Sequence, residues 1–240
     1  MEEIRKPMHN RKRIILAVCI VALAAIAALV VGIVIWRHSG SPRGINVEIG
    51  DTYRFGGIDW LVLDVKNGQA LLITKDIVEQ RRYHSSWDSV TWETCELRAY
   101  LNGTGAFEGK GFIDRFSVEE KARIRTTDNA NPNNQLYGTN GGKSTEDQVF
   151  LLSIEEAVKY FRDSGQLKNG NPNSAWYIID ECSKERVAKY DGNTWWWWLR
   201  SPGGVSIRAA HVSNGGSIDV GGYNVNRGEL GIRPAIWLDL

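Results

Sequence analysis

The chain has 240 residues, enough for one domain with a sizeable core and a terminal segment. Its formal net charge is +1 with acidic and basic residues interspersed, so there is no electrostatic reason to expect a nucleic-acid partner. Ten tryptophans and 25 glycines predict aromatic-rich strands separated by long glycine-rich loops.

The N-terminal segment predicts a membrane anchor. Residues 14–36 contain no charged residue and would span about 34 Å as a helix, enough to cross a bilayer core. Lys and Arg are denser before this segment than after it, which places residues 1–13 in the cytoplasm and the rest of the chain outside. No small-residue cleavage site follows Trp36, so we expect an uncleaved signal anchor with a single pass.

Small residues recur at every fourth position of this segment, at Ala24, Ala28 and Gly32. Such a row can pair two membrane helices, but in an alanine-rich span it more often arises by chance, so a homodimer is only a weak hypothesis. Residues 37–46 carry Ser, Gly and Pro and are typical of a linker. The extracytoplasmic domain is then predicted over residues 47–240.

The first part of that domain predicts a three-stranded antiparallel meander. Alternating residues from 53 to 55 are followed by a Gly56-Gly57 turn and by the apolar run 60–65. Asn67-Gly68 is a strong two-residue hairpin signal, and residues 70–74 form the returning strand.

Three helix starts follow. Thr91 is expected to cap a helix that ends at Asn102-Gly103. Ser117 and Ser153 each precede a glutamate by three residues, which is the capping-box pattern. An apolar strand is expected over residues 149–152, before the last of these helices.

Residues 126–147 form a polar loop that is too long to be idle in a compact domain, so we expect it to be functional or partly disordered. Its side-chain oxygens could ligate Ca²⁺, the one cofactor considered, although their register does not fit an EF-hand. A solvated loop with turns is the favoured alternative, and no other metal or cofactor is expected. The oxygen-bearing residues are Asp128, Asn129, Asn131, Asn133, Asn134, Asn140, Glu146 and Asp147.

Four consecutive tryptophans, Trp195 to Trp198, open the C-terminal region. On a strand they alternate between two faces, so both faces should be covered, as in a central strand. We therefore expect them to be core residues rather than a ligand platform. Further strands are expected over residues 209–212, 218–220 and 232–238.

Motifs for catalysis or metal binding are sparse beyond the membrane segment. Within residues 47–240, His84 and His211 are the only histidines, and there is no H-E-x-x-H and no paired C-x-x-C. Cys95 and Cys182 are the only cysteines of the domain, and they could form a disulfide or remain small buried residues. A non-enzymatic protein without catalytic residues is the expectation.

Four motifs in order resemble those of an uncharacterised bacterial extracytoplasmic domain family. They are Thr-Trp-Glu-Thr-Cys-x-Leu-Arg at 91–98, Val-Phe-Leu-Leu-Ser at 149–153, Trp-Trp-Leu-Arg-Ser-Pro-Gly at 197–203 and Gly-Ile-Arg-Pro-Ala at 231–235. That family is distantly similar to the C-type-lectin-like fold of formylglycine-generating, sulfatase-modifying enzymes. The resemblance implies an α+β domain with small antiparallel sheets, two or more helices and long loops. It does not imply the enzyme activity, because the reactive cysteines lie near the end of that domain and residues 183–240 contain none.

The same fold includes the variable proteins of diversity-generating retroelements, which display changeable side chains on their C-terminal β region. The resemblance implies that residues 204–229 present a contact surface, and their polar-plus-tyrosine composition is like that of a paratope. A solvated hairpin is the competing interpretation. The expected ligand-binding residues are Ser206, Arg208, His211, Ser213, Asp219, Tyr223, Asn224, Asn226 and Arg227.

The leading hypothesis is a membrane-anchored, non-catalytic recognition module that binds a protein or a glycan outside the cell. One alternative is a structural domain that helps to assemble a cell-envelope complex. The other is an enzyme that derives from the formylglycine-generating group and has changed its chemistry. Binding here is inferred mainly by analogy of fold.

Overall fold

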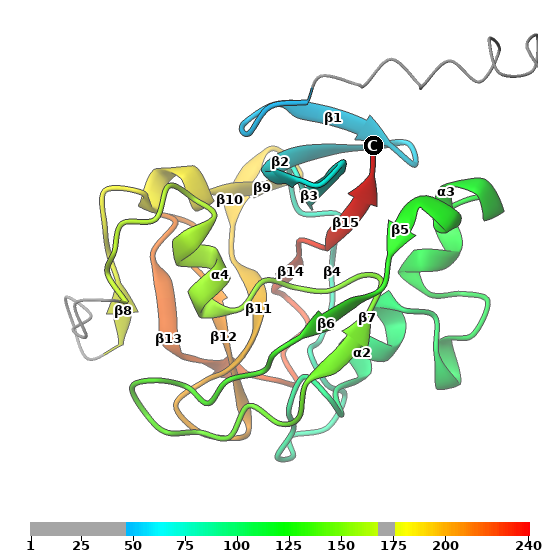
Figure 1. Cartoon of the computed structure of the whole chain (residues 1–240). Helices are drawn as coiled ribbons and strands as arrows, with labels where there is room; N and C mark the ends of the chain where they lie inside the picture. Colours follow the sequence, from blue (N-terminus) through cyan, green and yellow to red (C-terminus); the bar gives the residue numbers. More distant parts are fainter. Residues whose placement is uncertain (1–46, 168–175) are drawn as a thin grey trace, which may run out of the picture. The chain divides into compact units, whose positions relative to one another are not determined.

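The computed structural model describes residues 47–167 and 176–240, and these residues belong to one compact unit (Figure 1). The predicted anchor at 14–36, its Ala24 to Gly32 row and the linker at 37–46 lie outside the described residues. None of the helices in the described part of the chain has the length and apolar character needed to cross a membrane.

The domain is mostly β, with small sheets and few helices. Its first sheet is entirely antiparallel and contains the predicted meander, which is confirmed. Asn67 and Gly68 both have positive φ, as expected for the tight turn between the second and third strands. The strand order is β1 (Thr52–Phe55), β2 (Ile58–Lys66), β3 (Gln69–Thr74), β15 (Ala235–Asp239) and β5 (Ile124–Arg125).

The second sheet has β11 in its interior, between β14 and β12, so the predicted central strand is confirmed from Trp197 onward. Two short hairpins, β6–β7 and β9–β10, complete the β structure of the described residues. The sheet order is β4 (Glu79–Gln80), β14 (Gly231–Ile232), β11 (Trp197–Pro202), β12 (Arg208–Val212), β13 (Ile218–Asn224) and β8 (Tyr177–Ile178). The hairpins are β6 (Thr127–Asn129) with β7 (Thr145–Asp147), and β9 (Ala188–Tyr190) with β10 (Asn193–Trp195).

The last predicted strand, 232–238, is divided between the two sheets at Arg233 and Pro234. Pro234 has no N–H to donate to a ladder, and the Arg233 side chain is buried. Arg233 Nε donates to Thr74 O at 2.7 Å and Nη2 donates to Lys75 O at 2.9 Å. Its guanidinium also lies 5.1 Å from the Trp197 ring centroid, and burial lowers its pKa to about 10. Arg233 therefore joins the end of β3 to the core of the second sheet.

The α-helices of the described part of the chain are short for an α+β domain, because each has six residues. The capping boxes at Ser117 and Ser153 are confirmed. The predicted start of the first helix at Thr91 is wrong. Thr91 O accepts a hydrogen bond from Thr94 N in a turn, and the helix is capped instead by Cys95, whose Sγ accepts from Arg98 N at 3.4 Å. The elements are α2 (Glu96–Leu101), η1 (Gly105–Phe107), η2 (Phe112–Arg115), α3 (Val118–Arg123), α4 (Ile154–Lys159) and η3 (Ser183–Arg186).

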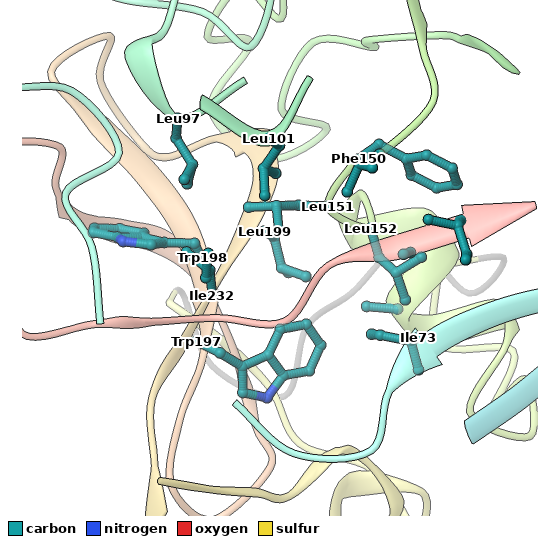
Figure 2. Packing of buried hydrophobic residues seen from close by; sticks show 14 of the residues in the cluster. Ile73, Leu97, Leu101, Phe150, Leu151, Leu152, Trp197, Trp198, Leu199 and Ile232 are labelled. Atoms are coloured by element: carbon teal, nitrogen blue, oxygen red, sulfur yellow. The ribbon is translucent and has the colours of Figure 1, made fainter. Parts of the chain in front are cut away.

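Residues 149–152 are fully buried but do not form the predicted strand. Only Phe150 makes a bridge, through two backbone hydrogen bonds with Ala235 of 3.0 and 2.7 Å. Figure 2 shows why the segment is apolar: its side chains gather with those of α2, β3, β11 and β14 in one cluster. Trp197 and Trp198 lie in this cluster and have no exposed surface.

The long loop 126–147 is neither disordered nor simply solvated, because several of its polar residues are buried. Its ends pair as the β6–β7 hairpin. The Asp147 carboxylate accepts hydrogen bonds from Arg98 Nε at 2.5 Å, Trp92 Nε1 at 3.0 Å and Thr145 Oγ1 at 2.8 Å. This fully buried acid fixes the base of the loop against α2 and its preceding turn.

Asn134 fixes the far part of the loop to the second sheet. Its Nδ2 donates to Pro202 O at 2.9 Å and to Val220 O at 2.8 Å, while its Oδ1 accepts from Leu136 N at 3.0 Å. Asn131 Oδ1 accepts from Arg200 Nε at 3.2 Å. The oxygens considered as calcium ligands at these positions are thus engaged by donors of the chain itself, and within the described residues no group of three or more His, Cys, Asp or Glu is placed to hold a metal.

Cys95 and Cys182 are both free and buried in this structure. Burial raises the pKa of the Cys95 thiol to about 12. A thiol of that kind is not a nucleophile at neutral pH, so Cys95 acts as a packing residue and as the cap of α2.

Candidate ligand-binding face

The run of four tryptophans is half core and half surface. Trp197 and Trp198 are buried, whereas Trp195 and Trp196 are 39% and 37% exposed. The cause is a change of sheet: β10 ends at Trp195 and β11 begins at Trp197, and between them the Trp196 carbonyl accepts a hydrogen bond from Gly231 N at 2.8 Å. The expectation that all four tryptophans are core residues on a strand covered on both faces is therefore wrong for the first two.

Trp196 forms an aromatic cluster with two residues predicted to bind ligand. Its ring centroid lies 5.6 Å from that of His211 and 5.9 Å from that of Tyr223, and the His211 and Tyr223 rings are 6.1 Å apart. The register of the second sheet produces this arrangement, because Trp198 pairs with His211 and places Trp196 beside it on the same side. Trp198 itself contacts the His211 ring at 6.4 Å from below.

Charged side chains border these rings on two sides. Asp219 is the cross-strand partner of His211, and its Oδ2 lies 4.0 Å from His211 Nε2. Arg227 Nη2 donates to the Tyr223 hydroxyl at 3.5 Å, and its guanidinium lies 5.6 Å from the Tyr223 ring centroid. We call the surface formed by Trp196, His211, Asp219, Tyr223 and Arg227 the aromatic face.

The aromatic face continues to Trp195 through one backbone turn. Arg227 Nε donates to Glu229 Oε1 at 2.9 Å, and the Glu229 carbonyl accepts from Trp195 Nε1 at 2.6 Å. The side chains from Trp195 to Asp219 are therefore linked without a break. They offer flat rings together with two acids, Asp219 and Glu229, and one guanidinium.

His211 is the electrostatically unusual member of the face. Burial lowers the pKa of its imidazole, and the neighbouring Asp219 carboxylate opposes that shift. The ring is therefore neutral at neutral pH. Its Nδ1 is buried and has no hydrogen-bond partner in the part of the chain that the structure describes. A neutral, fixed imidazole beneath Trp196 supports the ring from the protein side.

The structure brings four of the nine predicted residues, His211, Asp219, Tyr223 and Arg227, onto the aromatic face. The other five serve neighbouring contacts. Arg208 Nε donates to Asn224 Oδ1 at 3.4 Å at the other end of the β12–β13 pair, and Asn226 is partly buried in the turn before Arg227. Ser206 Oγ pairs with Ser89 Oγ at 2.8 Å, and Ser213 Oγ pairs with Ser217 Oγ at 2.7 Å inside a hairpin turn.

Sequence reasoning missed Trp195 and Trp196, because four identical residues carry no alternation from which a face can be read. It also missed Tyr137 and Trp176, whose rings lie 5.9 Å apart; Trp176 lies against Gly221 of β13, and Tyr137 lies against Gly204. Tyr177 belongs to the same edge, since the Asp219 charge raises the pKa of its hydroxyl. No local signal links these residues to Asp219, because they come from distant segments.

Comparison with known protein families matches residues 67–240 to a domain of unknown function, DUF6273. The chain belongs to the DUF6273 family. Comparisons with curated proteins and with solved structures give no match. The expectation of an uncharacterised domain family is thus confirmed, and every residue of the aromatic face lies within the DUF6273 match.

The folded unit extends beyond the DUF6273 match at its N-terminal end. The match begins in the turn between β2 and β3, yet β2 pairs with β3 from Lys66 and Gln69 to Trp60 and Thr74. Trp60 is completely buried and donates its Nε1 to Phe55 O at 2.9 Å. In this chain, β1 and β2 therefore complete the first sheet of the DUF6273 domain.

Proposed function

We propose that this protein is a membrane-anchored, non-catalytic recognition module. Its DUF6273 domain binds a protein or glycan ligand outside the cell, and residues 14–36 anchor it with the N-terminus in the cytoplasm. The aromatic face supports the binding role, and the uncharged stretch with its asymmetric flanking charges supports the anchor. The resemblance to C-type-lectin-like domains, on which the C-terminal β region displays contact residues, belongs to the same proposal.

One observation carries the proposal: Trp196 stays more than one-third exposed while it packs on His211 and Tyr223. A large ring that could be buried is instead held at the surface in a fixed orientation. Rigid aromatic side chains lose little conformational entropy when a ligand covers them. Tryptophan, tyrosine and arginine are also the residues that dominate binding energy at recognition surfaces. Trp196, Tyr223 and Arg227 supply all three types.

The test is a screen of the full-length protein, in mild detergent, against glycan and protein arrays with and without Ca²⁺. We expect at least one ligand, with binding lost in Trp196→Ala and in Tyr223→Ala. Trp87→Ala is the matched control, because Trp87 is 61% exposed and lies outside the aromatic face. Loss of binding in the control, or unchanged binding in both variants of the aromatic face, would show that the binding site lies elsewhere. If the folded protein binds nothing on either array, the proposal is wrong.

A further inference from the structure

A separate pocket of about 420 Å³ has Gly228, the residue after Arg227, in its lining. Its volume falls in the range of small-molecule sites. Four segments contribute to its lining: the loop after β4, the start of α2, the end of η1 and the loop after β13. The residues that matter for its chemistry are Arg82, Ser85, Glu96, Leu97, Phe107 and Gly228.

Arg82 provides a free positive charge in this pocket. It is exposed, and no carboxylate among the described residues lies within ion-pair distance of its guanidinium. The neighbouring Arg81 differs, because its Nε pairs with Glu79 at 3.3 Å and its guanidinium stacks 3.5 Å from the Tyr100 ring centroid. Arg82 packs its stem near Gly228, where an added Cβ would lie 3.5 Å from Arg82 Cγ. The guanidinium of an arginine can bind a carboxylate with two hydrogen bonds.

Glu96 provides the opposite charge, and Ser85 fixes it in place. Ser85 Oγ donates to Glu96 Oε1 at 2.5 Å, and Ser85 N donates to Glu96 Oε2 at 3.1 Å. Each oxygen keeps capacity for another donor, since a carboxylate accepts about four hydrogen bonds. Within the described residues no lysine, arginine or histidine forms an ion pair with it. Both oxygens are therefore oriented while the negative charge stays uncompensated.

Phe107, which is partly exposed, adds an apolar surface to these two charges. We infer that the pocket binds a small zwitterion with an apolar side chain, the chemistry of an apolar amino acid or a short peptide made of such residues. The ligand carboxylate pairs with Arg82, its ammonium group with Glu96, and its side chain packs on Phe107. A simple anion fits less well because it would pair with Arg82 but face the like charge of Glu96, and a simple cation would pair with Glu96 but face the like charge of Arg82.

This site is distinct from the aromatic face and does not depend on the function proposed for it. Arg227 contacts the Tyr223 ring, whereas the adjacent Gly228 lines the pocket. The Glu229 carbonyl accepts from Gln80 Nε2 at 2.9 Å as well as from Trp195 Nε1. The turn that contains Arg227 and Gly228 thus borders both the aromatic face and the pocket.

The experiment is calorimetric titration of the full-length protein with L-phenylalanine and two analogues, each of which lacks one charge. N-acetyl-L-phenylalanine retains the carboxylate only, and L-phenylalaninamide retains the ammonium group only. We expect phenylalanine to bind, and each analogue to bind about tenfold more weakly or worse, because each loses a charge-assisted contact. No heat with phenylalanine, or equal affinity for all three compounds, would overturn the inference.

Two variants test which pocket residue binds each charged group of the ligand. In Arg82→Gln, phenylalanine and its amide should bind equally, because the carboxylate no longer has a partner. In Glu96→Gln, which keeps acceptor and donor atoms near Ser85, phenylalanine and its N-acetyl derivative should bind equally. Arg54→Gln is the control, since Arg54 is an exposed arginine of β1. If either variant keeps the wild-type ratio of affinities, the proposed orientation of the ligand is wrong.

Discussion

Trp196 stacks on His211 with their ring centroids 5.6 Å apart and their planes inclined by 39°, and His211 is the cross-strand neighbour of Asp219. An exposed indole thus rests on a buried, neutral imidazole, which in turn faces a carboxylate. Protonation of that imidazole would place a charge directly beneath the candidate ligand platform. The stability of the domain and the binding of its ligand should therefore share a dependence on His211.

That dependence predicts a loss of stability in mild acid. The folded-state pKa of His211 is lowered by burial, so the folded protein binds this proton less readily than the unfolded chain does. The contribution is fully present above the unfolded value of 6.5 and is lost as the pH falls through the folded pKa. The free energy of unfolding, measured in urea from pH 7.5 to 5, should fall more steeply for the wild type than for His211→Phe. If the free energy of unfolding depends on pH in the same way for both proteins, Asp219 fully offsets the effect of burial on the pKa of His211.

The two halves of the tryptophan run should respond differently to truncation. Trp197→Ala removes a fully buried ring that donates to Arg186 O at 3.0 Å, at an expected cost of about 3–5 kcal/mol. Trp196→Ala removes a partly exposed ring and should cost about 1 kcal/mol. Urea denaturation of both variants tests the contrast. Equal losses would mean that Trp196 is a core residue and would remove the main support for the aromatic face.

Tyr223→Ala should leave the free energy of unfolding within about 1 kcal/mol of the wild-type value, because its ring lies only partly within the protein. Its neighbour across the sheet, Ala209, is buried and belongs to the core instead. Thermal melting compares Tyr223→Ala with the wild type. A loss of several kcal/mol would identify Tyr223 as a structural residue rather than an outward contact residue.

Asp147→Asn should loosen the loop 126–147 without unfolding the whole domain. The substitution removes the negative charge that compensates Arg98; because the Arg98 side chain is 28% exposed, the cost should be smaller than the about 3–5 kcal/mol of breaking a fully buried pair. Hydrogen exchange should accelerate first in residues 127–147, while β2 and β3 stay protected. Glu146→Gln is the control, since Glu146 is exposed. Exchange that rises equally in all strands would show that the loop and the core unfold together.

Arg233→Lys should destabilise the domain although it keeps the charge. A lysine cannot reproduce the planar fork that reaches both Thr74 O and Lys75 O while stacking on Trp197. Leaving one buried carbonyl unpaired costs about 1–3 kcal/mol. Urea denaturation measures this loss. Arg54→Lys, at an exposed arginine, should show no comparable change.

Local chemistry was enough to predict several elements of this domain. Asn67-Gly68 requires positive φ at two successive positions, and a serine followed by a glutamate three residues later satisfies the first N–H groups of a helix. Both signals act within a few residues, so no distant part of the chain can easily overrule them. The meander and the helices after Ser117 and Ser153 accordingly occur where they are predicted.

Tertiary structure alone decided the rest, because it depends on partners far away in the sequence. The polar loop 126–147 is ordered by Arg98, Arg200 and backbone carbonyls of the second sheet, and none of these can be inferred from the loop itself. The burial of Trp197 and the exposure of Trp196 depend on where one sheet ends and the next begins. Sequence thus determined turns, caps and apolar segments, while long-range packing determined which aromatic residues reach the surface.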